Sequence, residues 1–307
     1  MSVEAIAVKM GDLQLANPTV LASGVLGSSL SKVVEALRYG AGGAVTKSIG
    51  PLPRDGYAEP TLVEADSGMV NAAGLPNPGA DRFAEELVSI QGKRLPVLVS
   101  IFGGDEAEFR KVAETIEKQD FAAFELNLSC PHVKGVGTEV GHDPEEVGRV
   151  VKAVKRVSKK PVFAKLSPNT DRLVEVAQAA VDAGADGLTA INTISAFPID
   201  VETGRQALSN GLGGLSGGAI RPVALRCVYQ LRERFDVPIM GCGGVSTWEH
   251  AVQFFLAGAG AVQIGTATMA KFAIFNDINV GVISYLDRKG VKSLEELVGA
   301  AHRTGGA

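Results

Sequence analysis

Several residues of types that take part in chemistry follow short apolar runs in this sequence. They comprise two amines, one thiol, several amides and hydroxyls and, near the end of the chain, paired glycines. Amines and thiols can transfer protons or act as nucleophiles, and glycine amides can bind a phosphate. In chain order the residues are Ser23, Lys47, Ser48, Asn127, Cys130, Lys165, Asn192, Thr193, Gly243, Gly244, Gly265 and Thr266.

Cys130 is the sharpest candidate for a catalytic residue. It comes shortly after Asn127, just past an apolar run, and opens a glycine-rich segment. A thiol there can abstract a proton, act as a nucleophile or merely fill space, and a lone cysteine is most often a packing residue. The neighbouring amide and the position after an apolar run favour a functional role. Cys227 and Cys242, by contrast, are interpreted as small buried hydrophobic residues.

Two lysines occupy equivalent positions after apolar runs. Lys165 alternates with Phe163, so both side chains are expected on one face of a strand, pointing inward. A lysine there can be an ion-pair partner, a Schiff-base nucleophile or a positive charge that supports an anionic flavin. The alternative is a surface lysine that extends out of the fold. The same possible roles and the same alternative apply to Lys47, within Ala-Val-Thr-Lys-Ser.

The elements that position these residues alternate along the whole chain. Short apolar runs predict strands, and each run is followed by an amphipathic stretch that predicts a helix. Eight such units favour an α/β fold, the (β/α)8 TIM barrel, over an open sheet. The predicted strands are residues 19–21, 44–47, 97–101, 123–128, 162–166, 187–191, 238–241 and 261–264. The predicted helices are residues 30–38, 81–90, 106–117, 144–157, 171–183, 220–235, 247–257 and 275–288.

Three further features refine this prediction. Residues 5–16 alternate around Gly11-Asp12 and predict a small N-terminal β-hairpin that caps the barrel bottom. The glycine-rich segments 131–143 and 193–218 are expected to be loops at the C-terminal face, where TIM barrels carry their active sites. No linker or short repeat divides the chain, so residues 1–307 are expected to form a single domain.

The paired glycines predict a phosphate site. Gly243-Gly244 and Gly265 follow the seventh and eighth predicted strands, where TIM barrels commonly bind a phosphate through backbone N–H groups. The stretch from Gly211 to Gly217 superficially resembles a dinucleotide fingerprint, but it ends a long loop and lacks the fingerprint's spacing. On its own it is as consistent with turns as with binding. FMN therefore suits the predicted site better than a dinucleotide.

Composition argues against several other classes of function. The formal net charge is −4, aromatic residues are only 6%, and no basic run occurs, so no nucleic-acid partner is expected. The 3 cysteines are far apart and include no C-x-x-C pair, so neither a disulfide framework, a metal site nor an iron–sulfur cluster held by this chain alone is expected. Because no signal peptide or membrane-spanning run is apparent, a cytoplasmic location is expected.

The same segments resemble the dihydroorotate dehydrogenase family over nearly the whole chain. Each segment alone is short, but the combination, in the family's order, is highly specific. The resemblance implies FMN as cofactor and the oxidation of dihydroorotate to orotate in pyrimidine biosynthesis. The similar segments are NPTVLASGVLG, AVTKSIG, NAAGLPNPG, ELNLSCPH, FAKLSPN, INT, GGLSGGAIRP, GCGGV and VQIGTA.

The resemblance also implies roles for individual residues. Cys130 would be the base that removes the C5 proton of dihydroorotate while a hydride passes from C6 to flavin N5, and Lys165 would support the reduced flavin. Substrate contacts would come from Lys47, Asn71, Ala72, Ala73, Gly74, Leu75, Asn127, Asn192 and Thr193. Contacts to FMN would come from Ser23, Lys47, Ser48, Asn127, Lys165, Ile191, Gly217, Gly243, Gly244, Gly265 and Thr266.

The identity of residue 130 separates branches of the family. Cysteine there resembles the class 1 enzymes rather than the membrane-associated class, and the segment SCPHVKG is most similar to class 1B, the NAD-linked type. That type implies a partner subunit with FAD and a 2Fe–2S cluster, bound to a homodimer of this chain in a heterotetramer. Phe102 departs from the family, because many relatives carry a polar residue there near FMN.

Three other functions are alternatives to that of a dihydroorotate dehydrogenase. The flavin barrel of dihydropyrimidine dehydrogenase has a similar NLSCPH segment, so an enzyme that acts on uracil or thymine is the main alternative. A Schiff-base lyase that uses Lys165 is less consistent with Cys130 and the asparagines. A barrel that binds FMN but is catalytically silent is less consistent with the presence of a complete group of candidate catalytic and binding residues.

Overall fold

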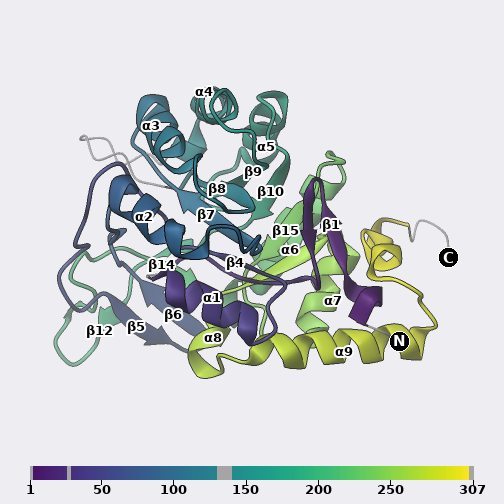
Figure 1. Ribbon diagram of the computed structural model, residues 1–307. Helices are drawn as coiled ribbons and strands as arrows, with labels where there is room; N and C mark the ends of the chain where they lie inside the picture. Colours follow the sequence, from purple (N-terminus) through teal and green to yellow (C-terminus); the bar gives the residue numbers. More distant parts are fainter. Residues whose placement is uncertain (1–2, 26–28, 130–139, 304–307) are drawn as a thin grey trace.

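A closed barrel of parallel strands forms the centre of the computed structural model, which describes residues 3–25, 29–129 and 140–303 (Figure 1). Each barrel strand pairs with the next one along the chain, and the last pairs with the first, so the predicted TIM barrel is confirmed. The predicted strand ends are correct or differ by one or two residues. The barrel strands are β3 (Thr19–Leu21), β4 (Gly43–Val45), β7 (Val97–Ile101), β8 (Ala123–Asn127), β9 (Val162–Leu166), β10 (Gly187–Ala190), β15 (Ile239–Cys242) and β16 (Ala261–Ile264).

Helices cover the outside of the barrel, and local sequence explains their starts and buried faces. Asp105 caps α3 by accepting a hydrogen bond from the Glu108 amide, and Asp143 caps α4 in the same way. In α3 the buried residues Phe109, Val112, Ala113 and Ile116 recur at helical spacing. The helices are α1 (Leu30–Arg38), α2 (Ala80–Leu87), α3 (Glu106–Ile116), α4 (Pro144–Lys155), α5 (Leu173–Asp182), α6 (Arg221–Arg232), α7 (Trp248–Ala257), α8 (Ala267–Ala270) and α9 (Ile274–Lys289).

The predicted N-terminal hairpin is confirmed. Strands β1 (Val8–Met10) and β2 (Leu13–Leu15) pair antiparallel, and Gly11 takes a φ of +65° in the turn between them. Met10, Leu13 and Leu15 pack in one cluster with residues from the lower part of the barrel interior. The hairpin therefore closes the N-terminal end of the barrel with apolar side chains.

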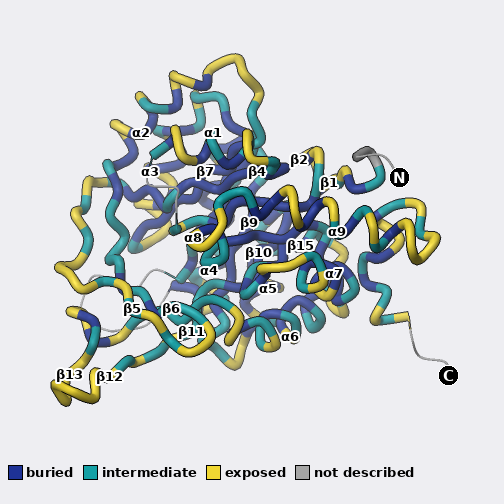
Figure 2. Tube along the Cα trace, turned by 90° about the horizontal axis from the view of Figure 1, so that it is seen from below, coloured by how far each residue is buried: buried dark blue, intermediate teal, exposed yellow. Residues whose placement is uncertain are grey.

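A second sheet lies on the opposite side of the barrel from this hairpin, and the sequence did not predict it (Figure 1). Its strands, in spatial order, are β11 (Ile194–Ala196), β14 (Gly213–Ser216), β6 (Gly68–Asn71) and β5 (Leu62–Ala65). The segment 193–218, which was expected to be a loop, thus supplies two of the strands. A further hairpin, β12 (Ile199–Asp200) with β13 (Arg205–Gln206), extends from this sheet and is exposed (Figure 2).

The barrel interior changes in character from bottom to top. The apolar cluster at the bottom includes Leu98, Ala123 and Phe163, which alternate with outward-facing residues along their strands. Two residues further along the same strands come Ser100, Glu125 and Lys165, and all three are buried as well. Since side chains of a strand alternate in direction, these polar residues share the inward face one level higher. The barrel is therefore packed with apolar side chains below and polar ones above.

The described ranges contain neither a membrane-spanning helix nor a cluster of metal-ligating side chains. No helix there combines the length and the apolar character needed to cross a bilayer. Nor do these ranges contain a group of three or more histidine, cysteine or acidic side chains that could hold a metal ion. The organisation of residues 1–307 as a single domain stays a prediction.

Candidate active site

A chain of hydrogen bonds joins polar side chains at the C-terminal end of the barrel. Asn192, just past β10, donates from Nδ2 to Oδ1 of Asn127 at 3.1 Å. Asn127 in turn donates from Nδ2 to Ser48 Oγ at 3.0 Å, and Ser48 Oγ lies 2.9 Å from Ser100 Oγ. The backbone N–H of Thr193 donates to Asn192 Oδ1 at 2.8 Å. Four of the predicted site residues therefore meet, and these hydrogen bonds hold the side-chain amides of Asn127 and Asn192 in a defined orientation.

The second sheet brings two more predicted residues together. Asn71 ends β6, and its Nδ2 donates to the carbonyl oxygen of Gly214 in β14 at 3.1 Å. A Cβ atom at Gly214 would lie only 2.1 Å from Thr193 Oγ1, so this approach requires glycine. Asn71 and Thr193 thus contact the same residue of β14, one through its side-chain amide and the other through its hydroxyl group.

Residues 72–75 follow as a tight loop of partly buried residues, except that Ala72 is fully buried. Leu75 takes a φ of +56°, a region that side chains other than glycine rarely adopt and that clusters at functional sites. Asn77 holds this loop, because its Nδ2 donates to the Leu75 carbonyl at 3.0 Å while its Oδ1 accepts from the amides of Gly50 and Gly79. Asn77 was not identified from the sequence.

Lys47 is a partly buried amine at the same end of the barrel. It lies two residues after Val45, whose side chain packs in the apolar cluster at the barrel bottom, so it shares the inward face. Burial lowers the pKa of Lys47 from its ordinary value, because the ammonium group loses hydration. Within the described ranges no acidic side chain offsets this loss. A carboxylate or another anionic group of a ligand would offset it.

The predicted phosphate-binding glycines converge from separate loops. Gly217 and Gly244 have φ values of +94° and +72°, and a Cβ on Gly244 would lie 2.6 Å from the Gly217 carbonyl oxygen. In the part of the chain that the structure describes, the backbone N–H groups of Gly243, Gly244 and Gly265 donate no hydrogen bond. Buried or half-buried amides without an acceptor are costly, so they favour an anionic ligand.

The loop after β16 completes this glycine site. Thr266 Oγ1 donates to Ser216 Oγ at 2.8 Å, which joins the loop to the end of β14. The short helix α8 begins directly afterwards, as at the phosphate sites of many TIM barrels. A Cβ on Gly265 would lie 3.5 Å from Ala22 Cβ, so Ser23, the next residue after Ala22, lies in a neighbouring loop. Ile191, also predicted to contact FMN, is buried, and its amide donates to the Cys242 carbonyl.

Lys165 lies inside the barrel and not on its surface. Its side chain is 5% exposed, and Nζ lies 3.2 Å from Oε1 of Glu125, which is fully buried. Desolvation alone would lower the pKa of Lys165, but the negative charge of Glu125 and its hydrogen bond outweigh this and raise that pKa. Lys165 is therefore a positively charged group in the interior. The alternative of a surface lysine is excluded.

Cys130 and the rest of 130–139 lie outside the described residues. The two ends of that segment are close together, because the Gly141 amide donates to the Leu128 carbonyl at 2.8 Å. Cys227 is fully buried on α6, as predicted. Cys242 as a whole is only partly buried. Burial of its thiol raises the pKa of that group.

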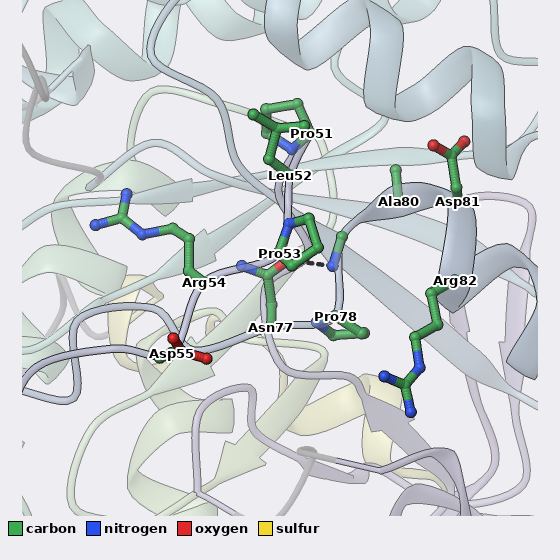
Figure 3. A pocket seen from close by; sticks show the side chains of 11 residues that line it. Pro51, Leu52, Pro53, Arg54, Asp55, Asn77, Pro78, Ala80, Asp81 and Arg82 are labelled. Carbon is green, nitrogen blue, oxygen red and sulfur yellow. Dashed lines mark hydrogen bonds between the residues drawn. The ribbon is translucent and has the colours of Figure 1, made fainter.

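A cavity of about 350 Å³ lies beside the loop that Asn77 holds, and it is lined by residues 51–55 and 77–82 (Figure 3). Arg54 and Arg82 extend on opposite sides of Asn77 in this view. None of the predicted site residues lines this cavity. Phe102 does not line this cavity and is buried, with Gly50 so close that a Cβ there would be 2.4 Å from its ring.

Sequence reasoning missed the polar residues inside the barrel, chiefly Glu125 and Gln263. A signal for them was present, since Glu125 stands two residues before Asn127 in a strand and must share its inward face. In a barrel interior, which branched apolar residues usually fill, a charged residue on that face is exceptional. Strand alternation applied to every polar residue would have found both.

The chain is similar to known proteins over nearly its whole length. The sequence model of the family described as Dihydroorotate dehydrogenase matches residues 5–286. A curated relative from Pyrococcus furiosus, named dihydroorotate dehydrogenase B (NAD(+)), catalytic subunit, is 50% identical over 97% of this chain and 99% of its own length. Relatives of the same name from Pyrococcus horikoshii and Methanocaldococcus jannaschii are 48% and 44% identical, over 96% and 94% of this chain and 97% and 96% of their own lengths. The chain therefore belongs to the dihydroorotate dehydrogenase family, as its motifs predicted, and within that family it resembles the class 1B catalytic subunits.

Proposed function

We propose that this chain catalyses the FMN-dependent oxidation of dihydroorotate to orotate in pyrimidine biosynthesis. The observation that carries the proposal is the linked set Ser48, Asn127 and Asn192 at the barrel mouth, with the amine of Lys47, which has no acidic partner among the described residues, at the same end. Amide groups can donate to and accept from a planar pyrimidine ring, and an amine can pair with its carboxylate. The names of the relatives support the same reaction.

FMN fits the glycine site. The amides of Gly243, Gly244 and Gly265 would bind its phosphate, because no acceptor within the described ranges occupies them. Ser23, Gly217 and Thr266 line the same loops, and Ser48, Asn127, Ile191, Lys47 and Lys165 would contact the rest of the cofactor. When bound, FMN supplies the acceptor for the hydride from C6 of dihydroorotate.

The substrate would lie between the barrel mouth and the second sheet. Asn71, Thr193 and the loop 72–75 come from that sheet or its connections, while Asn127 and Asn192 end barrel strands. Amide groups would then lie on two sides of one ligand. Such a ligand would have to be flat and polar at its edge, as a dihydropyrimidine is.

Cys130 is proposed as the base that takes the proton from C5 of dihydroorotate. In the sequence it follows Ser129, which comes two residues after Asn127, the member of the hydrogen-bonded amide chain that ends β8. A thiol with the reference pKa of about 8.5 is mostly protonated at neutral pH, so the rate of reduction should rise with pH unless the site lowers that pKa. The thiolate form of Cys130 would accept this proton and become a thiol, and Lys47 would hold the carboxylate of the substrate.

The electrons are proposed to pass to NAD through a partner subunit that carries FAD and a 2Fe–2S cluster. The word "subunit" in the relatives' name supports a partner, and the NAD(+) in that name supports the acceptor. The three cysteines of this chain are too few and too dispersed to hold such a cluster. A homodimer of this chain at the core of a heterotetramer, located in the cytoplasm, is part of the proposal.

An anaerobic titration tests the reaction. The purified chain, loaded with FMN, should lose its yellow colour within one turnover when dihydroorotate is added, before any acceptor is present. A flavin that stays oxidised with dihydroorotate but is reduced by dihydrouracil would favour the dihydropyrimidine dehydrogenase type instead, as would a chemically reduced flavin that uracil reoxidises. A chain that takes up no FMN would contradict the proposal.

A further inference from the structure

Four buried polar side chains form a cluster inside the barrel, directly above its apolar bottom. They are Glu125 on β8, Lys165 on β9, Thr189 on β10 and Gln263 on β16, here called the interior cluster, and each is at most 4% exposed. Both carboxylate oxygens of Glu125 are used. Oε1 faces Lys165 Nζ at 3.2 Å, and Oε2 accepts from Thr189 Oγ1 at 3.1 Å and from Gln263 Nε2.

Folding alone does not explain this cluster. TIM-barrel interiors are usually filled by branched apolar residues, which pack without any cost of desolvation. A buried ion pair is often no more stabilising than apolar residues of similar volume, because both charges lose their hydration. Glu125 and Lys165 are therefore better explained by a task at the site above them than by stability.

The hydrogen bonds of Lys165 indicate that task. An ammonium group has three N–H donors. One is directed at Glu125 Oε1 and a second at Gln263 Oε1, 3.0 Å away. Within the described ranges no further acceptor binds Nζ, so one donor remains for a ligand. Lys165 pairs in register with Asn127 on one side and Thr189 on the other, which places it level with the amide chain of the mouth.

We infer that Glu125 is the positioning residue for Lys165, and that together with Gln263 it holds the Lys165 ammonium charged and directed at the bound flavin. The inference rests on the proposed function, in which Lys165 contacts FMN. Glu125 itself touches neither cofactor nor substrate and acts only through Lys165. The other titratable group that acts on Lys165 is Cys242 on β15, where burial raises the pKa of the thiol.

A double-mutant cycle on FMN binding tests this inference. The dissociation constant of FMN is measured by fluorescence titration of the apoprotein for the wild type, Glu125→Gln, Lys165→Met and the double variant. Glu125→Gln should weaken FMN binding roughly tenfold or more, because a charged hydrogen bond is misplaced or lost. In the Lys165→Met background the same change should have almost no effect, because Glu125 acts only through Lys165.

The chain offers a matched control at the other end of the same strand. Lys160, just before β9, pairs with Glu117 at 3.9 Å, and their side chains are 21% and 18% exposed, more than those of Lys165 and Glu125. Glu117→Gln should therefore leave FMN binding unchanged in either background. A loss of FMN affinity from Glu125→Gln that persists in full with Lys165→Met would overturn the inference, as would no loss at all.

A second variant covers the case in which Glu125→Gln does not fold. Glu125→Asp keeps the charge but withdraws the carboxylate by one methylene, so it should weaken FMN binding by a smaller factor. The two-electron midpoint potential of bound FMN, followed from about pH 6 to pH 9, should gain a titration step in this variant that the wild type lacks, because a less well-paired Lys165 loses its proton at lower pH. Wild-type affinity together with a wild-type pH profile would contradict the inference.

Failure of the inference and failure of the proposed function give different results. If the wild type binds no FMN or its flavin is not reduced by dihydroorotate, the proposed function fails and the role of Glu125 fails with it. If the wild type binds FMN and is reduced, while all Glu125 variants behave as the wild type, only the role of Glu125 is wrong.

Discussion

The lower and upper layers of the barrel interior are built from the same strands and are equally buried, yet they differ in chemistry. The lower layer holds Leu98, Ala123 and Phe163, and the upper layer holds the residues two positions later on each strand, Ser100, Glu125 and Lys165. Met240 and Ala261 are related in the same way to Cys242 and Gln263. The lower layer thus consists of apolar packing residues, and the layer directly above it consists of polar or ionisable residues.

The two layers also end differently. The β1–β2 hairpin closes the lower layer with Met10, Leu13 and Leu15. The upper layer opens instead to the amide chain, Lys47 and the glycine loops. A direct contact between the layers is the approach of Gln263 Nε2 to Met240 Sδ at 3.7 Å. We therefore expect substitutions above the boundary between the two layers to affect catalysis or ligand binding, and substitutions below it to affect stability.

Above the boundary, loss of the base should have the largest effect. Cys130→Ala is expected to slow reduction of the flavin by dihydroorotate by roughly 10²- to 10⁴-fold, because a positioned base contributes about that much. Anaerobic stopped-flow absorbance measures the rate, and FMN should remain bound. Cys227→Ala, on the outer helix α6, serves as the control and should leave the rate unchanged. Reduction of Cys130→Ala at the wild-type rate would make the base assignment wrong.

Below the boundary, the expected loss is one of stability. Phe163→Ala removes a fully buried ring of the lower layer and should lower the free energy of unfolding by about 3–5 kcal/mol. Urea denaturation followed by circular dichroism measures this loss. The variant that remains folded should bind FMN as the wild type does. A change of FMN affinity as large as that of Glu125→Gln would show that the layers are not separable.

At the mouth itself, removal of one amide should have a moderate effect. Asn127→Ala breaks the hydrogen bonds to Ser48 and Asn192 and should weaken orotate binding by roughly tenfold, with little loss of stability. Isothermal titration calorimetry with the FMN-loaded protein measures the affinity. Gln178→Ala removes an exposed amide that bonds to Asp182 on α5 and is the control. Equal effects of the two substitutions on orotate affinity would show that Asn127 does not belong to the binding site.

The smallest expected effect concerns pH. Because burial lowers the pKa of Lys47, this ammonium group is charged at low pH and loses its charge, as pH rises, earlier than an exposed lysine would. Orotate affinity should therefore fall a few-fold as pH rises through that lowered pKa, whereas Lys47→Arg should keep its affinity because arginine stays charged. Affinities measured between about pH 7 and pH 10 decide this. A wild-type affinity that rises with pH would have the wrong sign.

The sequence alone was sufficient for the barrel, for most strand and helix ends and for the grouping of Ser48, Asn127 and Asn192 at the mouth. These features depend on local alternation and on the rule that C-terminal strand ends carry the site. The second sheet was missed because its strands are short and partly exposed, and because the pairing that joins its two halves, β6 with β14, spans about half of the chain's length. Hydrogen bonds such as that from Lys165 to Glu125 depend on register between strands, which a single sequence does not specify.

A crystal structure of the chain with FMN and orotate tests the central claim most directly. The account predicts the FMN phosphate on the amides of Gly243, Gly244 and Gly265, and orotate within hydrogen-bond distance of Asn127 and Asn192. Lys165 Nζ should keep Glu125 and Gln263 as partners and direct its remaining donor at the flavin. Orotate bound in the cavity beside Asn77, or a flavin that does not approach Lys165, would contradict it.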